Sequence, residues 1–417
     1  MSTETKKEIR ESWKTPIVMG SLALVVLVFF GILGKPGLVS FELTGPREAI
    51  QFPNIDVGSA VLGTISGVLL LAIAAYVAWQ VSKNIRASIW FSMLFGAIAL
   101  VALLGWLAAG TVVPVAFILG SALVLAVPIM LGAMGGIMSE RVGVVNIAIE
   151  GQLLTGAFMA AVVSTLTGNQ ILGIISAMIT AALFSAVLAV FAVRFLAQQI
   201  IVGVVLNVLA IGITNFLYQQ WVTEDESATN SPGTLPIVSI PVLGDIPIIG
   251  PVLFQNRITV FLAIAIVIVL WFVLFKTKLG LRARAVGENP LAADTVGINV
   301  GRTRFWWVTL GGLLAGLGGA ALTIGSSGSF GREMSGGLGF IALAVVILGR
   351  WHPGYATAAA LLFGFSIILR IWASQVSPGI PTNFITMVPY LVTLIAVVGF
   401  VGRSRPPAAD GIPYVKG

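Results

Sequence analysis

The sequence predicts an all-α polytopic membrane protein, and three observations support this fold class. Of the 417 residues, 58% are hydrophobic and only 9% are charged, which is too little charge to cover a soluble protein of this length. Apolar runs long enough to cross a bilayer follow one another along the chain. Glycine is abundant, with 48 residues, and small residues let helices pack closely in lipid.

The apolar runs define the predicted membrane helices. A hydrocarbon core about 30 Å thick needs roughly 20 mainly apolar residues per helix. Runs of this kind lie at 17–33, 57–80, 89–109, 113–131, 147–166, 171–193, 200–219, 258–275, 304–324, 354–373 and 385–402. A shorter run, GFIALAVVILG at 339–349, is about half a span. We therefore expect about 11–12 hydrophobic segments, one of them a half-helix.

Basic residues predict the orientation of the first span and of the whole chain. The first span follows a basic stretch without a small-x-small cleavage site after it, so we expect a retained anchor rather than a signal peptide. Of the 23 lysines and arginines, 18 fall on segments that this topology places in the cytoplasm. The five at the outer side are Lys35, Arg47, Arg257, Arg332 and Arg370. This bias predicts that both termini are cytoplasmic and that the polar stretch 222–257 is an outer loop.

Two segments share a layout that predicts an inverted internal repeat. They read LGAMGGIMSERVGVVNIAIEGQLLTGAF and LAGLGGAALTIGSSGSFGREMSGGLGFIALAVVILG. Each has a Gly-rich helix end, a polar link with Arg and Glu, and an apolar helix, with the first link inside and the second outside. Inverted repeats are common in transporters, where broken helices between the halves line the substrate path. Chance similarity between Gly-rich helices is the alternative.

The domain organisation follows from the spans and the repeat. We expect an N-terminal extension with three membrane helices at 1–110 and a core at 111–405. Within the core, the repeat halves lie at about 113–220 and 304–402, with a cytoplasmic loop at 276–303 between them. Residues 406–417 form a cytoplasmic tail.

Two polar residues at the start of the span 147–166 are candidate functional residues. Asn146 and Glu150 are four residues apart, which predicts that they share a helix face. A charge at the bilayer centre costs ~3 kcal/mol, so Glu150 should not face lipid. It can line a wet path, cap the N-terminus of a neighbouring half-helix, or tie helices together near the inner surface. Four more amides, Gln198, Gln199, Asn207 and Asn215, are expected to hydrogen-bond between helices, with a role as ligands of the solute as the alternative.

The cytoplasmic stretch TKLGLRARAVGENPLAADTVGINVGRTR contains a short helix with clear ends. Asn289 can cap it, Pro290 suits its first position, and Gly297 ends it. Leu291, Asp294 and Thr295 share one face. A helix of about two turns is unstable alone in water, so it needs a surface to dock on, either its own membrane domain or a partner.

Several classes of active site have no counterpart in the sequence. No GxxxxGK[ST] loop is present, cysteine is absent, and His352 is the only histidine, so no catalytic residues and no metal site are expected. We interpret His352 as structural. The spans hold few ionisable residues, whereas proton-coupled carriers need relays of them. This scarcity indicates transport driven from outside the chain.

Three motifs carry a resemblance to a known family. SERVGVVNIAIEGQLLTGAF resembles the signature of the membrane subunits of bacterial ABC importers for nucleosides and simple sugars, which are related to branched-chain amino acid permeases. RARAVGENPLAADTVGINV resembles their cytoplasmic coupling segment, and GGLGFIALAVVILGRWHP their second-half motif. The matches span roughly 113–402, and the three N-terminal spans lie outside this common core.

The resemblance implies partners and roles for residues. It implies a plasma-membrane complex with cytoplasmic ATP-binding subunits, a second permease that is often a non-identical homologue, and an extracytoplasmic solute-binding lipoprotein. ATP and Mg²⁺ would sit on the partner ATPase, this chain would bind no cofactor, and it would contact membrane lipids but no nucleic acid. The implied path residues are Asn146, Glu150, Gly151, Gln152, Asn207, Gly339 and Phe340. The implied ATPase-coupling residues are Arg284, Ala285, Gly287, Glu288, Asn289, Pro290, Leu291 and Asp294.

The motif wording is most similar to nucleoside permeases, with ribose- or galactose-type sugars as the alternative and branched-chain amino acids less favoured. Three other functions remain open from the residues alone. A gradient-driven secondary transporter would move solute without ATP. A channel or structural membrane protein would need no ATPase. An enzyme acting on lipid would need a catalytic constellation that the sequence does not display.

Overall fold

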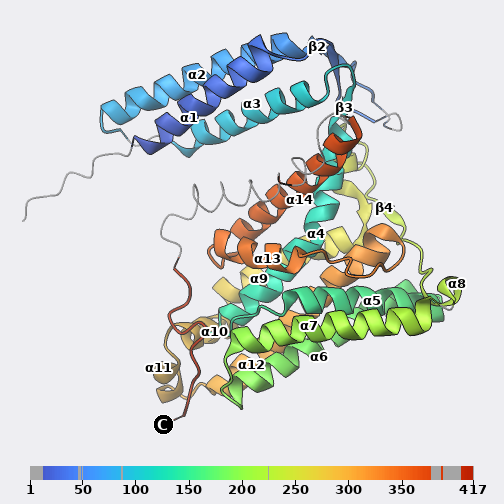
Figure 1. Cartoon of the computed structure of the whole chain (residues 1–417). Coiled ribbons are helices and arrows are strands. Elements are labelled where there is room, and N and C mark those ends of the chain that lie inside the picture. Colours follow the sequence, from blue (N-terminus) through green and yellow to red (C-terminus); the bar gives the residue numbers. More distant parts are fainter. Residues whose placement is uncertain are drawn as a thin grey trace, which may run out of the picture. The chain divides into compact units, whose positions relative to one another are not determined.

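The computed structural model describes residues 13–45, 48, 50–85, 88–223, 225–376, 387 and 405–416 (Figure 1). Within them lie ten helices that are long and apolar enough to cross a membrane, and each corresponds to a predicted span. The predicted half-helix is also present, as the 11-residue α13 (Leu338–Leu348). The all-α membrane class is thereby confirmed. The predicted span 385–402 lies outside the described residues apart from Met387, and the inverted repeat stays a prediction.

The chain divides into two compact units. One comprises residues 1–117 and 371–385, and the other comprises residues 118–370 and 386–417. The elements of the first unit up to residue 114 are α1 (Lys14–Val25), a π-helical continuation (Val26–Ile32), β1 (Leu38–Glu42), β2 (Ile55–Gly58), α2 (Ser59–Ser82), α3 (Ile89–Leu107) and β3 (Val112–Pro114). β1 pairs antiparallel with β2 and parallel with β3. A separate apolar core, which includes Met19, Leu70 and Phe95, holds its helices together.

The second unit is built mainly from helices. They are α4 (Val115–Glu140), α5 (Ile149–Thr167), α6 (Gln170–Val193), α7 (Gln199–Leu217), α8 (Glu226–Thr229), α9 (Ile258–Lys276), α10 (Lys278–Glu288), α11 (Pro290–Thr295), α12 (Val300–Leu322), α13 and α14 (Pro353–Val376), with the ends of α4 and α14 belonging to the first unit. Short π-helical segments lie at Tyr218–Val222, Gly250–Phe254 and Thr323–Ser327. Two strands, β4 (Ile237–Ser239) and β5 (Gln255–Arg257), pair antiparallel within the stretch that we predicted as an outer loop.

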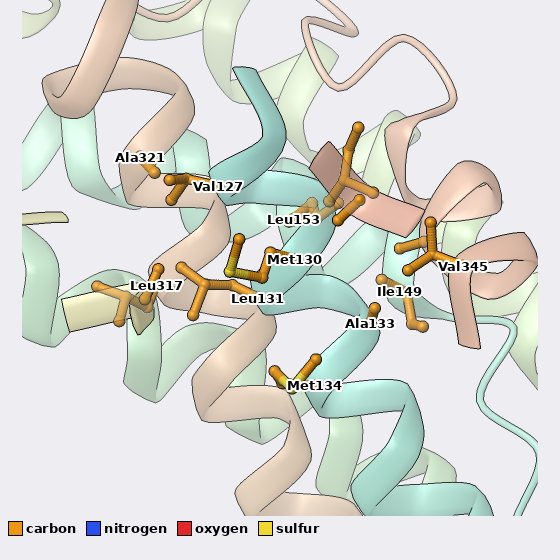
Figure 2. Packing of buried hydrophobic residues seen from close by; sticks show 14 of the residues in the cluster. Val127, Met130, Leu131, Ala133, Met134, Ile149, Leu153, Leu317, Ala321 and Val345 are labelled. Atoms are coloured by element: carbon orange, nitrogen blue, oxygen red, sulfur yellow. The ribbon is translucent and has the colours of Figure 1, made fainter. Parts of the chain in front are cut away.

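The core of the second unit lies around α5 and α12. Of the most apolar stretch of each helix, 78% of α5 and 72% of α12 is buried. Side chains from α4, α5, α12 and α13 form one apolar cluster, in which Met130, Leu153, Leu317 and Val345 take part (Figure 2). The helices α5, α6 and α7, coloured green in Figure 1, pack against one another. This central packing fixes the position of the first turn of α5.

The structure corrects one predicted boundary and adds one helix. The span predicted to end at residue 131 continues as α4 to Glu140, because its Gly-rich end packs directly on another helix: the backbone of Gly135 lies against that of Gly311 on α12. Within the predicted cytoplasmic loop 276–303, the segment 278–288 forms α10, a helix that we did not predict. One side of α10 packs against the core, and its buried residues are Gly280, Ala283, Val286 and Gly287. These tertiary contacts stabilise a helix that the composition of the segment does not predict.

Candidate functional site

Glu150 lies in the first turn of α5 and caps the N-terminus of α13. Its Oε1 accepts hydrogen bonds from the Ser335 hydroxyl at 2.6 Å and the Gly337 N–H at 2.8 Å. Its Oε2 accepts one from the Gly339 N–H at 2.7 Å. A helix N-terminus has unpaired N–H groups and a positive dipole end, so a carboxylate there is stabilised. Of the three roles left open for Glu150, the structure shows the cap on a neighbouring half-helix, and both carboxylate oxygens are used within the protein.

Gly339 is the residue that lets α5 and α13 meet. It is buried, and a Cβ at this position would collide with the backbone N and Cα of Glu150 and would lie 2.8 Å from its Oε2. Only a residue without a side chain allows the two helix ends to approach so closely. Phe340, the next residue, does not join this contact, because its side chain is 51% exposed.

Asn146 and Glu150 do not share a helix face, so that prediction was wrong. α5 begins only at Ile149, which leaves Asn146 in the link 141–148 between α4 and α5. There Asn146 pairs with Gln152 through two amide–amide hydrogen bonds of 3.2 Å, and both side chains are fully buried. The paired amides satisfy each other, and they fold the link back onto the first turns of α5.

Amides on α7 hold the same link from another side. The Asn207 Oδ1 accepts from the Gly151 N–H at 2.8 Å, and its Nδ2 donates to the Ile147 carbonyl at 2.9 Å. The Gln199 Oε1 accepts from the Val145 N–H at 2.8 Å. The predicted interhelical hydrogen bond is confirmed for Asn207, which contacts α5, whereas Gln199 bonds to the link rather than to another helix. Asn215 donates instead to Glu333, in the turn before α13, at 3.2 Å and at an exposed position.

These contacts define what we call the α5 entry: the link 141–148, the first turn of α5 and the N-terminus of α13. The structure brings together six of the predicted path residues here, namely Asn146, Glu150, Gly151, Gln152, Asn207 and Gly339. Sequence reasoning missed Ser335 and Gly337. Their signal was the MSGGLG stretch directly before the half-helix, since a serine followed by glycines is typical of a helix start.

A cluster of aromatic and basic side chains lies at the other end of the link. The Arg141 guanidinium donates twice to the Trp351 carbonyl, at 3.0 and 2.8 Å, and the Trp351 indole N–H donates to Glu140. Arg284 of α10 lies 5.2 Å above the Phe275 ring, on which the His352 ring stacks at 5.0 Å. Burial and, to a lesser degree, Arg141 lower the pKa of His352. This packing connects α10 to the start of the link.

The predicted coupling residues lie on two consecutive helices. Asn289 caps α11, with its Oδ1 accepting from the Ala292 N–H at 3.0 Å, Pro290 occupies the first position, and Gly297 follows with φ of +85°, all as predicted. Leu291 is 63% exposed, whereas Asp294 is partly buried. Arg284, Ala285, Gly287 and Glu288 belong to α10 instead, and Gly287 is buried against the Arg141 carbonyl. α11 thus offers an exposed apolar tip while α10 contacts the core.

The chain was compared with known proteins. Residues 118–397 match the family model described as branched-chain amino acid transport system, permease component. The guanosine ABC transporter permease protein NupQ of Bacillus subtilis is 41% identical over 309 residues, which cover 72% of this chain and 97% of NupQ. The nucleoside ABC transporter permease protein NupC of Lactococcus lactis is 39% identical over 309 residues, 72% of this chain and 96% of NupC.

A third relative differs in the solute that its name gives. The putative glucose ABC transporter permease protein TsgC13 of Haloferax volcanii is 36% identical over 256 residues, which cover 61% of this chain and 77% of TsgC13. No solved structure matches the chain.

Proposed function

The chain belongs to the family of branched-chain amino acid transport system permease components, and from this membership we propose that it is the membrane-spanning subunit of an ATP-driven importer of nucleosides. The observation that carries the proposal is the similarity to two nucleoside permeases over almost their whole length. The motifs at the α5 entry and at α10 and α11 lie within the family match at 118–397.

The α5 entry suits the translocation path of a neutral polar solute. Its polar groups are amides, a hydroxyl and one capped carboxylate, and such groups can exchange hydrogen bonds with a sugar or a base without a counter-ion. The link 141–148 and the stretch before α13 are irregular backbone, which membrane proteins tolerate where it is buried in protein or lines a wet cavity. Binding of solute close to this entry is part of the proposal.

In this mechanism, the conformational change of the ATPase is transmitted to the chain through α11. A separate ATPase docks on the exposed Leu291 tip, and closure of the ATPase on ATP shifts α11 and α10 together. Gly287 and Arg284 of α10 lie against Arg141 and Phe275, so the shift reaches the link and then the first turn of α5. The carboxylate of Glu150 keeps the ends of α5 and α13 together as they move. Alternating access then results from the displacement of this pair.

The assembly that this mechanism needs follows the family. We expect two cytoplasmic ATP-binding subunits, a second permease that is a non-identical homologue, and an extracytoplasmic solute-binding lipoprotein, in a plasma membrane with both termini of this chain inside. ATP and Mg²⁺ bind to the partner, and this chain is not an enzyme.

The direct test is uptake by the reconstituted complex. Proteoliposomes that contain this chain, its second permease, the ATPase and the binding protein should accumulate labelled guanosine when ATP is supplied on the cytoplasmic side. Unlabelled nucleosides should compete, whereas glucose and ribose should not. Competition by the sugars alone would assign the chain to the sugar importers instead. Accumulation by this chain without ATPase or ATP would contradict the proposal and favour a secondary transporter.

Replacement of Leu291 tests the docking of the ATPase. Leu291→Asp places a charge on the exposed tip of α11, and burying an unpaired charge in an interface costs several kcal/mol. We expect ATP-driven uptake to fall by about 100-fold while the amount of chain in the membrane stays constant. Leu291→Met, which keeps an apolar side chain of similar volume, is the control and should keep most of the uptake. Normal uptake by Leu291→Asp would refute a docking role for this tip.

A further inference from the structure

The C-terminal segment, residues 405–416, docks on the elements to which the proposed function assigns coupling. At α10, the Ala409 N–H donates to the Gly287 carbonyl at 2.8 Å, and the Ala408 N–H donates to the Glu288 Oε2 at 3.3 Å. Ala409 itself is buried. The last turn of α10 leaves carbonyl groups without partners inside the helix, and the segment satisfies one of them.

A second contact joins the segment to the start of α12 through a buried arginine. Arg304 is only 1% exposed, and its Nη1 donates to the Ile412 carbonyl at 2.9 Å. Asp410 of the segment lies close by: burial raises the pKa of its carboxyl to about 7, and Arg304 acts in the opposite direction. Burying a guanidinium is costly unless hydrogen bonds and opposite charge compensate it. The segment supplies one hydrogen bond and the nearby Asp410 carboxyl, while the Arg304 Nε and Nη2 have no hydrogen-bond partner among the described residues. Arg304 therefore depends on the segment for the hydrogen bond that its guanidinium makes.

The same residues cover the link 141–148. Gly143 has φ of +83°, and a Cβ there would lie 2.7 Å from the Ala409 carbonyl oxygen and 2.8 Å from the Arg304 Nη2. Gly411 approaches the Val145 side chain, with 3.4 Å between its ideal Cβ and the Val145 Cγ2. Val145 is the residue whose N–H is held by Gln199 of α7. The segment thus packs on the part of the link that leads into the α5 entry.

A fourth contact reaches α11. Tyr414 packs on the apolar cluster that contains Ala293 and Val286, and its hydroxyl lies near the Asp294 carboxyl. Burial, and then this carboxyl, raise the pKa of Tyr414. With six residues, α11 cannot be stable by itself, so its position depends on contacts of this kind.

Taken together, these contacts connect the consecutive helices α10, α11 and α12 to the link 141–148, which lies far from them in the sequence. We propose that the C-terminal segment is a coupling element: it fastens α10 and α11 to the link 141–148, with Arg304 as its positioning residue, so that displacement of α11 moves the α5 entry. This inference rests on the proposed function. The segment does not contact the ATPase in this scheme; it carries the displacement to the link after the ATPase has docked.

The test measures the amount of solute that the complete complex takes up for each ATP it hydrolyses. Two variants remove the connection independently: Arg304→Gln, which loses the charge that faces Asp410 and weakens the bond to Ile412, and a chain that ends at residue 404. Their matched controls are Arg302→Gln, an exposed arginine two residues earlier on α12, and a chain that lacks only residues 416–417. Copurification of the ATPase and of the second permease is measured for each.

We expect both variants to retain the ATPase and the second permease and to hydrolyse ATP, while uptake per ATP falls by about fivefold or more. Both controls should take up as much solute per ATP hydrolysed as the wild-type complex. The inference would be overturned if an assembled complex with Arg304→Gln or with the truncated chain kept its uptake per ATP within about twofold of the wild-type value.

Two further outcomes would also overturn the inference. Loss of the ATPase with the second permease retained would make the segment a docking contact and overturn its assignment as a coupling element. Loss of both partners from both variants would make it a folding element, with the same consequence. Failure of the proposed function can be distinguished from failure of this inference. In that case the wild-type complex itself would show no ATP-driven guanosine uptake.

Discussion

Two membrane helices of the same length, α5 and α9, are built for opposite surroundings. Each has 19 residues. Among the ten candidate spans in the described residues, α5 has the lowest mean hydropathy and is 78% buried over its most apolar stretch, whereas α9 has the highest and is 28% buried. α5 carries Glu150, Gln152 and Thr155 in the interior, while α9 exposes Ile268 and Val269.

The difference shows where a membrane protein can place polar groups. Lipid offers no hydrogen-bond partners, so a helix that faces lipid must be apolar, as α9 is. A helix surrounded by protein can carry polar side chains if its neighbours satisfy them, and α7 and α13 do this for α5. Low hydropathy in a span is therefore a sign of central position, and three experiments on α5, on its neighbours α12 and α7, and on α9 test this interpretation.

The largest effect is expected from Glu150→Ala. Three donors, the Ser335 hydroxyl and the N–H groups of Gly337 and Gly339, would lose their acceptor in a buried place. Each unsatisfied buried donor costs about 1–3 kcal/mol, so the loss should be roughly 3 kcal/mol or more, and uptake should be abolished. Thermal unfolding of the purified complex and guanosine uptake measure the two effects. Glu150→Gln, which keeps one oxygen acceptor, should be affected less.

A moderate effect is expected from Gly319→Val on α12. The helix packs so closely on α5 here that a Cβ would lie 2.9 Å from the Gly156 carbonyl carbon and nearer still to the Leu153 oxygen. Overpacking of this kind costs about 1–3 kcal/mol. The matched change on the exposed face of α9, Ile268→Val, should stay within about 0.5 kcal/mol. Equal shifts of the unfolding temperature in the two variants would remove the contrast between central and lipid-facing helices.

The smallest effect is expected from the amides of α7. Asn207→Ala removes the acceptor of the Gly151 N–H and the donor to the Ile147 carbonyl, at a cost of about 1–2 kcal/mol. Asn215→Ala on the same helix removes one exposed hydrogen bond of 3.2 Å, and the unfolding temperature should hardly change. If the two variants were equally stable, the α5 entry would not depend on α7 for its backbone partners.

Local features of the sequence determined much of this protein. Apolar run length alone located the ten described spans and the half-helix α13, because the bilayer thickness sets the length that a helix must have. Asn289, Pro290 and Gly297 located α11, because capping acts between residues that are close in sequence. The carboxyl of Glu150 could be assigned to protein rather than lipid on energetic grounds.

Only the tertiary structure decided which partners these residues have. Glu150 and Gly339 are separated by 189 positions, and no local pattern selects Gly339 over another helix N-terminus. The pairing of Asn146 with Gln152, the folding of 278–288 into α10 and the docking of the C-terminal segment on Arg304 likewise depend on surfaces that exist only once the helices have packed. Hydropathy and capping are local properties of a few neighbouring residues, whereas the satisfaction of a buried polar group depends on whatever the rest of the chain brings next to it.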